Sequence, residues 1–188
     1  MIFFFAGTII HHRKNLLTKK DLRRALEKLK KGDIVLTGNL RRASHFIIRG
    51  PVTHSMIYIG HRTFIHSIAD GVEEVSLHGI FTEYDTMIIL RPKTCSRKKT
   101  EKAVSEAKNL LGKPYDFEFT SGNEKFYCCE LVDYCLKKSG ICDGICKKAG
   151  PIRPQEFISE VFNIIFLSHN LEIKNHRPFL ILPIQKIL

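Results

Sequence analysis

Several features that commonly identify a protein class are missing from this sequence. No apolar run reaches the roughly 18 residues that a membrane-spanning helix requires. The 188-residue chain has only 6 cysteines, too few for a scaffold built on disulfides. It contains no zinc finger, no glycine-rich phosphate loop and no aromatic-basic RNA-binding signature. These absences leave an ordinary globular domain, in keeping with 44% hydrophobic and 26% charged residues.

The cysteine spacing also argues against a metal site. Cys142 and Cys146 are separated by three residues, where zinc ribbons commonly have two, and no second pair follows. Cys128 and Cys129 are adjacent and cannot easily bridge each other. We therefore expect no metal, no cofactor, and reduced thiols in a reducing compartment. The apolar residues 1–10 precede their charges and lack a cleavage site, so we expect a strand or docked segment and a cytoplasmic location, with a membrane-peripheral one as the alternative.

The charge balance is strongly basic, with 30 Lys and Arg against 19 Asp and Glu and a net charge of +11. Such an excess favours anionic partners, such as nucleic acid, acidic polymers or an anionic lipid surface. The basic residues are scattered in pairs and form no recognition motif, which favours a solvated surface and disfavours nucleic acid. The sequence does not indicate an oligomeric state.

The periodicity predicts a basic amphipathic helix near the start of the chain. Thr18 can cap it, with Asp21 as a short capping-box partner, and Gly32 ends it. Its apolar positions fall on one face and its lysines and arginines on the other. Packing on a sheet is the favoured role of this helix, and contact of residues 18–31 with an anionic membrane is the alternative.

The rest of the chain predicts an α+β fold, with an antiparallel sheet packed against helices. We expect helices over 100–111 and from Cys128 to Gly140, a short helix at Pro154, and two strands in 161–188. Residues 1–188 are expected to form a single domain, with a core at about 18–140 and C-terminal strands in 155–188. The remaining expected strands span 33–37, 46–48, 55–59, 63–67, 72–77 and 86–90.

Cys128 is a candidate nucleophile because it lies where a helix should begin. Unpaired backbone N–H groups at that end favour a thiolate, and the N–H of Cys128 itself is a natural oxyanion donor. Burial in the core is the competing interpretation. Cys129 should point about 100° away, toward Asp133, and is not expected to face the sheet.

The histidines supply candidate bases. His54 opens an expected strand, and His66 lies in the next one, so a hydrogen bond between them is geometrically reasonable. The other seven are expected to be solvated in loops or termini: His11, His12, His45, His61, His78, His169 and His176.

Five segments in this order resemble a known family: 32–36 (GDIVL), 53–60 (THSMIYIG), 65–72 (IHSIADGV), 112–116 (GKPYD) and 127–132 (YCCELV). The chain is similar to the YiiX-like group of the NlpC superfamily, papain-like cysteine peptidases and amidases in circularly permuted form. As in the related lecithin:retinol acyltransferases, His precedes Cys. The resemblance covers about residues 31–140.

The resemblance implies roles for individual residues. Cys128 would be the nucleophile, His54 its base and His66 the residue that orients the base, in a position where many relatives have Glu. Tyr115 matches a tyrosine that lines the oxyanion site, with packing as its alternative role. Cys129 replaces a small Ser that is common in the family, which leaves it as an alternative reactive thiol.

These features favour a cysteine hydrolase that cleaves an amide through a thioester acyl-enzyme. Its substrate would be a peptide, a cell-wall peptide or a lipid amide. One alternative is a lipid acyltransferase or thioesterase that uses the same triad at a membrane surface. Another is a basic protein that binds an anionic partner without catalysis.

Overall fold

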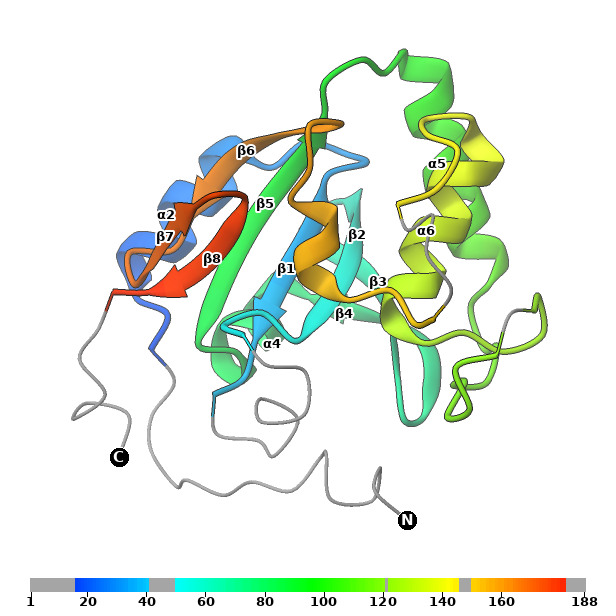
Figure 1. Ribbon diagram of the computed structural model, residues 1–188, viewed down its shortest axis with the longest axis horizontal. Coiled ribbons are helices and arrows are strands. Elements are labelled where there is room, and N and C mark those ends of the chain that lie inside the picture. The colour runs from blue at the N-terminus through cyan, green and yellow to red at the C-terminus, as the bar shows by residue number, and fades with distance from the viewer. Residues whose placement is uncertain (1–15, 41–49, 121, 146–149, 182–188) are drawn as a thin grey trace.

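The computed structural model describes residues 16–40, 50–120, 122–145 and 150–181. Its centre is a six-stranded antiparallel sheet in the order β4-β3-β2-β1-β5-β6 (Figure 1). The sequence-based prediction of an antiparallel sheet is therefore confirmed. The strands are β1 (Ile34–Gly38), β2 (His54–Gly60), β3 (Thr63–Ile68), β4 (Gly71–Ser76), β5 (Thr86–Pro92) and β6 (Phe162–Leu167).

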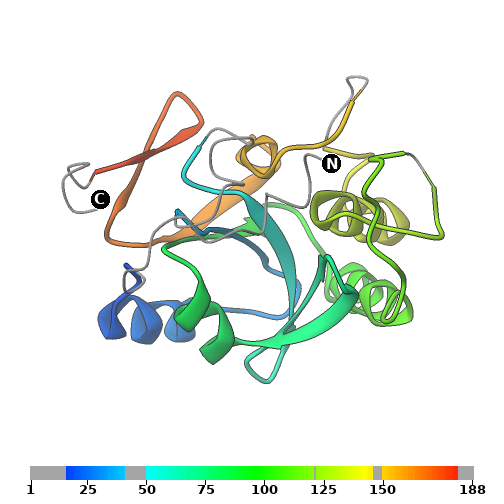
Figure 2. The same cartoon turned by 90° about the horizontal axis from the view of Figure 1, so that it is seen from below.

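Helices cover both faces of the sheet (Figures 1 and 2). Helices α5 (Arg97–Asn109) and α6 (Cys128–Ser139) contribute to the hydrophobic cluster on one face. Helices α2 (Lys19–Lys28) and α4 (Leu77–Glu83) contribute to a separate cluster on the other face. Because both faces are covered, the central strands are apolar at nearly every position instead of at every second one.

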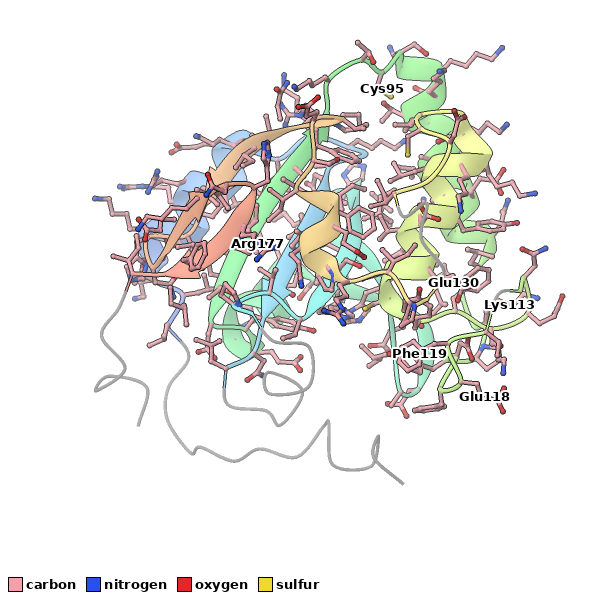
Figure 3. All side chains as sticks on the ribbon, in the orientation of Figure 1. Cys95, Lys113, Glu118, Phe119, Glu130 and Arg177 are labelled. Atoms are coloured by element: carbon pink, nitrogen blue, oxygen red, sulfur yellow. The ribbon has the colours of Figure 1, made fainter. Side chains whose placement is uncertain are left out.

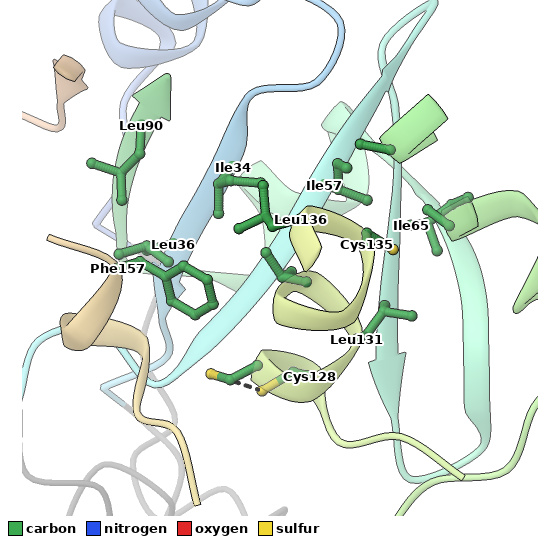
Figure 4. Close-up of a cluster of buried hydrophobic side chains, with 14 of the residues drawn as sticks. Ile34, Leu36, Ile57, Ile65, Leu90, Cys128, Leu131, Cys135, Leu136 and Phe157 are labelled. Atoms are coloured by element: carbon green, nitrogen blue, oxygen red, sulfur yellow. Dashed lines mark hydrogen bonds between the residues drawn. The ribbon is translucent and has the colours of Figure 1, made fainter. Parts of the chain in front are cut away.

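Strand β1 illustrates how one segment serves both faces. Ile34 and Leu36 pack with α6, whereas Val35 between them packs with α2 and α4. Figure 4 shows Leu136 of α6 near Ile34 of the sheet.

The C-terminal segment completes the sheet and adds a hairpin. Strand β6 pairs with β5, so a C-terminal strand belongs to the main sheet. The 3-10 helix η1 (Pro154–Phe157) precedes it, and β7 (Leu171–Lys174) and β8 (Arg177–Leu180) form a separate two-stranded sheet. The described part of 161–188 thus contains three strands, and the expectation of two was wrong.

Other boundaries differ for local reasons. Helix α5 begins at Arg97, earlier than expected, because Ser96 caps it by accepting the N–H of Lys99. The expected strand 72–77 ends at Ser76, which caps the unpredicted helix α4. The capping box of Thr18 and Asp21 at α2 is confirmed. The expected strand 46–48 and the apolar residues 1–10 lie outside the described residues.

Candidate active site

The candidate nucleophile lies at the first turn of α6, whose start is held by the surrounding chain. Tyr127, the N-cap residue, makes no side-chain capping bond, which leaves the first N–H groups of the helix available to a ligand. The Tyr127 hydroxyl accepts the N–H of Ile152 at 2.8 Å, and Ser67 Oγ of β3 donates to the Phe126 carbonyl at 2.5 Å. Cys128 is 8% exposed at this end of the helix (Figure 4).

The candidate base is the first residue of β2. His54 is 9% exposed, and its ring stacks on that of Tyr84 with a centroid distance of 5.8 Å and an interplanar angle of 6°. His54 Nε2 lies 3.0 Å from His66 Nδ1. The expected contact between these imidazoles is present, and it leaves Nδ1 of His54 as the nitrogen available to the Cys128 thiol.

The hydrogen-bonded chain continues one residue further than expected. His66 Nε2 lies 3.3 Å from Glu73 Oε1, and the two residues are cross-strand partners in the β3–β4 ladder. Burial, followed by the charge of His54, lowers the pKa of His66 to about 3, so His66 is neutral. The sequence predicted strands over 63–67 and 72–77, but it did not predict the register between them. With that register known, Glu73 would have been placed opposite His66.

The carboxylate of Glu73 determines the tautomers along this chain. A carboxylate only accepts, so Nε2 of His66 carries the proton and its Nδ1 is an acceptor. Nδ1 of His66 therefore receives a hydrogen bond from Nε2–H of His54. The remaining nitrogen of neutral His54 is then unprotonated and can remove a proton from a thiol.

The adjacent thiols are coupled to each other and differ in their surroundings. Their sulfur atoms lie 3.8 Å apart, as the dashed line in Figure 4 marks. A hydrogen bond from Cys129 lowers the pKa of Cys128 well below that of a free thiol, against the opposing effect of burial, and His54 lowers it further. Burial and the neighbouring Cys128 raise the pKa of Cys129. The electrostatics thus favour a thiolate at Cys128.

The expectation that Cys129 would not face the sheet was wrong. Ser55 Oγ donates to Cys129 Sγ at 3.4 Å, and Cys129 is 1% exposed. Ser55 has the same parity along β2 as Ile57, which packs beneath α6, whereas His54 shares the parity of Met56 in the opposite cluster. His54 is the first residue of β2, and from there it interacts with Cys128.

Tyr115 lies beside both thiols. Burial raises the pKa of Tyr115, and the neighbouring Cys128 and Cys129 raise it further, so its hydroxyl remains a donor. Backbone pairing holds its loop: the N–H of Val72 donates to the Lys113 carbonyl at 2.8 Å. Gly71 makes this pairing feasible, because a Cβ there would lie 2.6 Å from the Lys113 carbonyl oxygen.

The four other histidines in the described ranges are exposed, as expected: His61, His78, His169 and His176. His169 Nδ1 lies 2.7 Å from Asp21 Oδ2, at the start of α2 and in a contact that does not involve the thiols. His78 lies in α4. His11, His12 and His45 lie outside the described residues.

Comparisons with known proteins bear on the family and the fold of the chain. A sequence model of the permuted papain-like amidase enzymes of the YaeF/YiiX type matches residues 28–156. The crystal structure of the metalloprotein YiiX from Escherichia coli O157:H7 is similar, with a TM-score of 0.53, 20% identity, and coverage of 60% of this chain and 67% of that one. At this identity the structural likeness shows the fold alone. No curated protein matches the sequence.

Proposed function

Since the chain belongs to the permuted papain-like amidases of the YaeF/YiiX type, we propose that it is a cysteine amidase with Cys128 as nucleophile and His54 as base. The observation that carries this proposal is the 3.0 Å contact between His54 and His66, continued to Glu73. This series of hydrogen bonds leaves one nitrogen of His54 unprotonated and available to the thiol of Cys128, whose pKa is lowered. A histidine with a purely structural role would need neither an unprotonated nitrogen nor a neighbouring thiol of lowered pKa.

The proposed reaction is acyl transfer in two stages. The Cys128 thiolate attacks the amide carbonyl, and the oxyanion accepts hydrogen bonds from N–H groups at the start of α6 and from the Tyr115 hydroxyl. Protonated His54 then gives its proton to the amine as the C–N bond breaks, which leaves a thioester on Cys128. Finally, His54 removes a proton from water as the water oxygen attacks the thioester carbonyl. The C–S bond breaks, the carboxylic acid leaves, and the proton on His54 returns to the Cys128 sulfur.

These steps involve only side chains and backbone groups of this chain. The structurally similar YiiX is described as a metalloprotein. Among the residues described here, no group of three or more His, Cys, Asp or Glu side chains could hold a metal ion. The residues that we describe do not fit a metal centre, and we derive no step through one.

The family implies a peptide-like substrate, and we propose a peptide, a cell-wall peptide or a lipid amide. Fluorogenic peptidyl amides, muropeptides and N-acyl amino-acid lipids would be incubated with the wild type, Cys128→Ser and Cys129→Ser. We expect hydrolysis of one class, a covalent acyl adduct on wild type in intact-mass spectra, and neither in Cys128→Ser. Full activity in Cys128→Ser, with loss in Cys129→Ser, would contradict the assignment of the nucleophile.

A lipid acyltransferase at a membrane surface is the second candidate, and the exposed basic side chains of α2 favour it. The apolar face of α2 packs on the sheet, which is the role that the sequence favoured for this helix. Only the charge of its other face could therefore hold it on a membrane. No helix in the described ranges is long and apolar enough to span one. Lys19, Lys20 and Arg23 are exposed.

Vesicle sedimentation tests this candidate. Binding to phosphatidylserine vesicles and not to phosphatidylcholine vesicles, lost when Lys19, Lys20 and Arg23 become Glu, would support it. Acyl transfer to an added amine in preference to water would have to accompany that binding. Equal sedimentation with both vesicle types, or hydrolysis without transfer, would leave the amidase as the function.

A further inference from the structure

A cavity of about 860 Å³ lies between η1, the β7–β8 hairpin and the chain that leads into β2. Ligand cavities of this size hold a few amino-acid residues. Its lining includes Pro51, which precedes β2, together with Gln155 and Glu156 of η1 and Arg177 of β8. Figure 3 shows Arg177 between the hairpin and η1.

The cavity adjoins the candidate active site through two of its walls. Pro51 lies three residues before His54, and its carbonyl accepts a hydrogen bond from Thr86 of β5, which fixes this approach to β2. The η1 wall lies near the thiols, because Phe157 of η1 belongs to the same buried cluster as Cys128 and Cys129. A substrate in the cavity could therefore extend to Cys128.

The cavity lining carries positive charge that no ion pair among the described residues neutralises. Arg153 and Arg177 line the cavity, and no carboxylate in the described ranges forms an ion pair with either arginine. The Glu156 carboxylate lies in the same wall, where its Oε2 accepts the N–H of Arg153 at 2.7 Å. Guanidinium groups without a partner favour a ligand that brings a carboxylate.

The η1 wall also contains a buried hydrogen-bond acceptor without a donor. Gln155 Oε1 is buried and has no partner among the described residues. A buried acceptor without a donor costs free energy that a ligand N–H can recover. A ligand that brings both an amide N–H and a carboxylate would complement Gln155 and the arginines together.

We propose that this cavity binds an acidic segment of the peptide-like substrate, with a carboxylate at Arg153 and Arg177 and a backbone N–H at Gln155. The inference rests on the proposed amidase function for the identity of the ligand as substrate. Binding itself does not require catalysis, so the two can fail separately.

The test uses full-length Cys128→Ser and two blocked peptides, acetyl-Ala-Glu-Glu-Ala-amide and acetyl-Ala-Gln-Gln-Ala-amide, titrated by NMR. We expect the Glu peptide to bind about tenfold more tightly at low salt, with shifts in the resonances of the lining residues. Addition of 0.5 M NaCl should remove most of that preference. Equal affinities, or shifts located elsewhere, would overturn the proposal.

Matched second substitutions separate the local charge from the net charge. Arg177→Glu should abolish the preference for the Glu peptide, whereas Lys102→Glu, an exposed site on α5 with the same charge change, should preserve it. Gln155→Leu should weaken both peptides by a similar factor of about three to ten. Survival of the preference in Arg177→Glu would refute the proposed site.

Wild-type hydrolysis then separates the two proposals. If Cys128→Ser binds the acidic peptide selectively and the wild type hydrolyses no amide, the proposed function fails and the cavity assignment stands. If the wild type hydrolyses acidic and neutral amides equally well, the cavity assignment fails and the amidase stands.

Discussion

Two of the described histidines, His169 and His54, form hydrogen bonds with different consequences. The His169 side chain is 39% exposed and ends on Asp21, whose oxygens also accept the N–H and hydroxyl of Thr18 and the N–H of His169. His54 is buried and bonded through one nitrogen to His66, and its other nitrogen is on the side of a buried thiol. A histidine contact alone therefore does not identify a base. We propose His54 as the base because its second nitrogen is available to Cys128, whose pKa is lowered.

The carboxylates at the ends of these contacts also differ. Asp21 is buried, and although burial opposes it, hydrogen bonds from Thr18 and His169 lower the pKa of Asp21 overall. Its folded-state pKa is depressed, so its stabilising contribution is present above the unfolded pKa and is lost as the pH falls through the folded pKa. Glu73 is 48% exposed, and its carboxylate bonds the imidazole of His66. We expect Asp21 to affect folding and Glu73 to affect turnover.

The largest difference is expected between His54→Ala and His169→Ala. Removal of the proposed base should lower kcat by about 10³- to 10⁴-fold, because thiolate formation and proton transfer to the amine both depend on it. His169→Ala should change kcat less than about twofold. Steady-state kinetics and thermal unfolding of both variants check this, and comparable losses of activity would remove the distinction.

His66→Ala should lower kcat by about 10²-fold with little change in KM, because His54 loses the acceptor that fixes its tautomer. His66→Gln, whose amide oxygen can accept the same N–H, should recover part of the loss. A purely structural role would instead lower the melting temperature equally in both variants, without this difference in kcat.

Glu73→Ala and Asp21→Asn should act on different quantities. Glu73→Ala is expected to lower kcat by about tenfold with an unchanged melting temperature. Asp21→Asn should cost about 1–3 kcal/mol of unfolding free energy at neutral pH, a deficit that shrinks below about pH 4 as Asp21 of the wild type protonates. Urea unfolding at several pH values and kinetics at neutral pH would distinguish them, and a reversed pattern would contradict the assignment.

The smallest expected effect concerns Glu130, beside the loop that carries Tyr115 (Figure 3). Burial, followed by Asp116, raises its pKa to about 7, and its Oε2 has no hydrogen-bond partner among the described residues. A raised pKa means that stability present at low pH is lost as the pH rises through about 7. Glu130→Gln should therefore raise the melting temperature by a few degrees at pH 8 and leave it unchanged at pH 4.5. No difference between these pH values would contradict this.

Much of the fold was predictable because it is encoded locally. The capping box at Thr18, the helical spacing from Cys128 and the apolar strands each lie within one segment. The resemblance supplied the spacing that joined His54 to Cys128, and the sequence model of the family matches over the same region.

The side-chain contacts that the sequence did not predict depend on strand register and on the approach of distant segments. Glu73 joins the imidazole chain only because the β3–β4 register places it opposite His66. Ser55 meets Cys129 because parity along β2 turns Ser55, and not His54, toward α6. The His169–Asp21 contact joins residues that are 148 positions apart, which no local pattern predicts.

The most direct test of the central claim is limited alkylation by iodoacetamide near pH 6, followed by peptide mapping. Because Cys129 and His54 both lower the pKa of Cys128, whereas burial and Cys128 raise that of Cys129, the account predicts that Cys128 is labelled first. His54→Ala should slow this labelling. Preferential labelling of Cys129, or equally slow labelling of both thiols with no effect of His54→Ala, would contradict it.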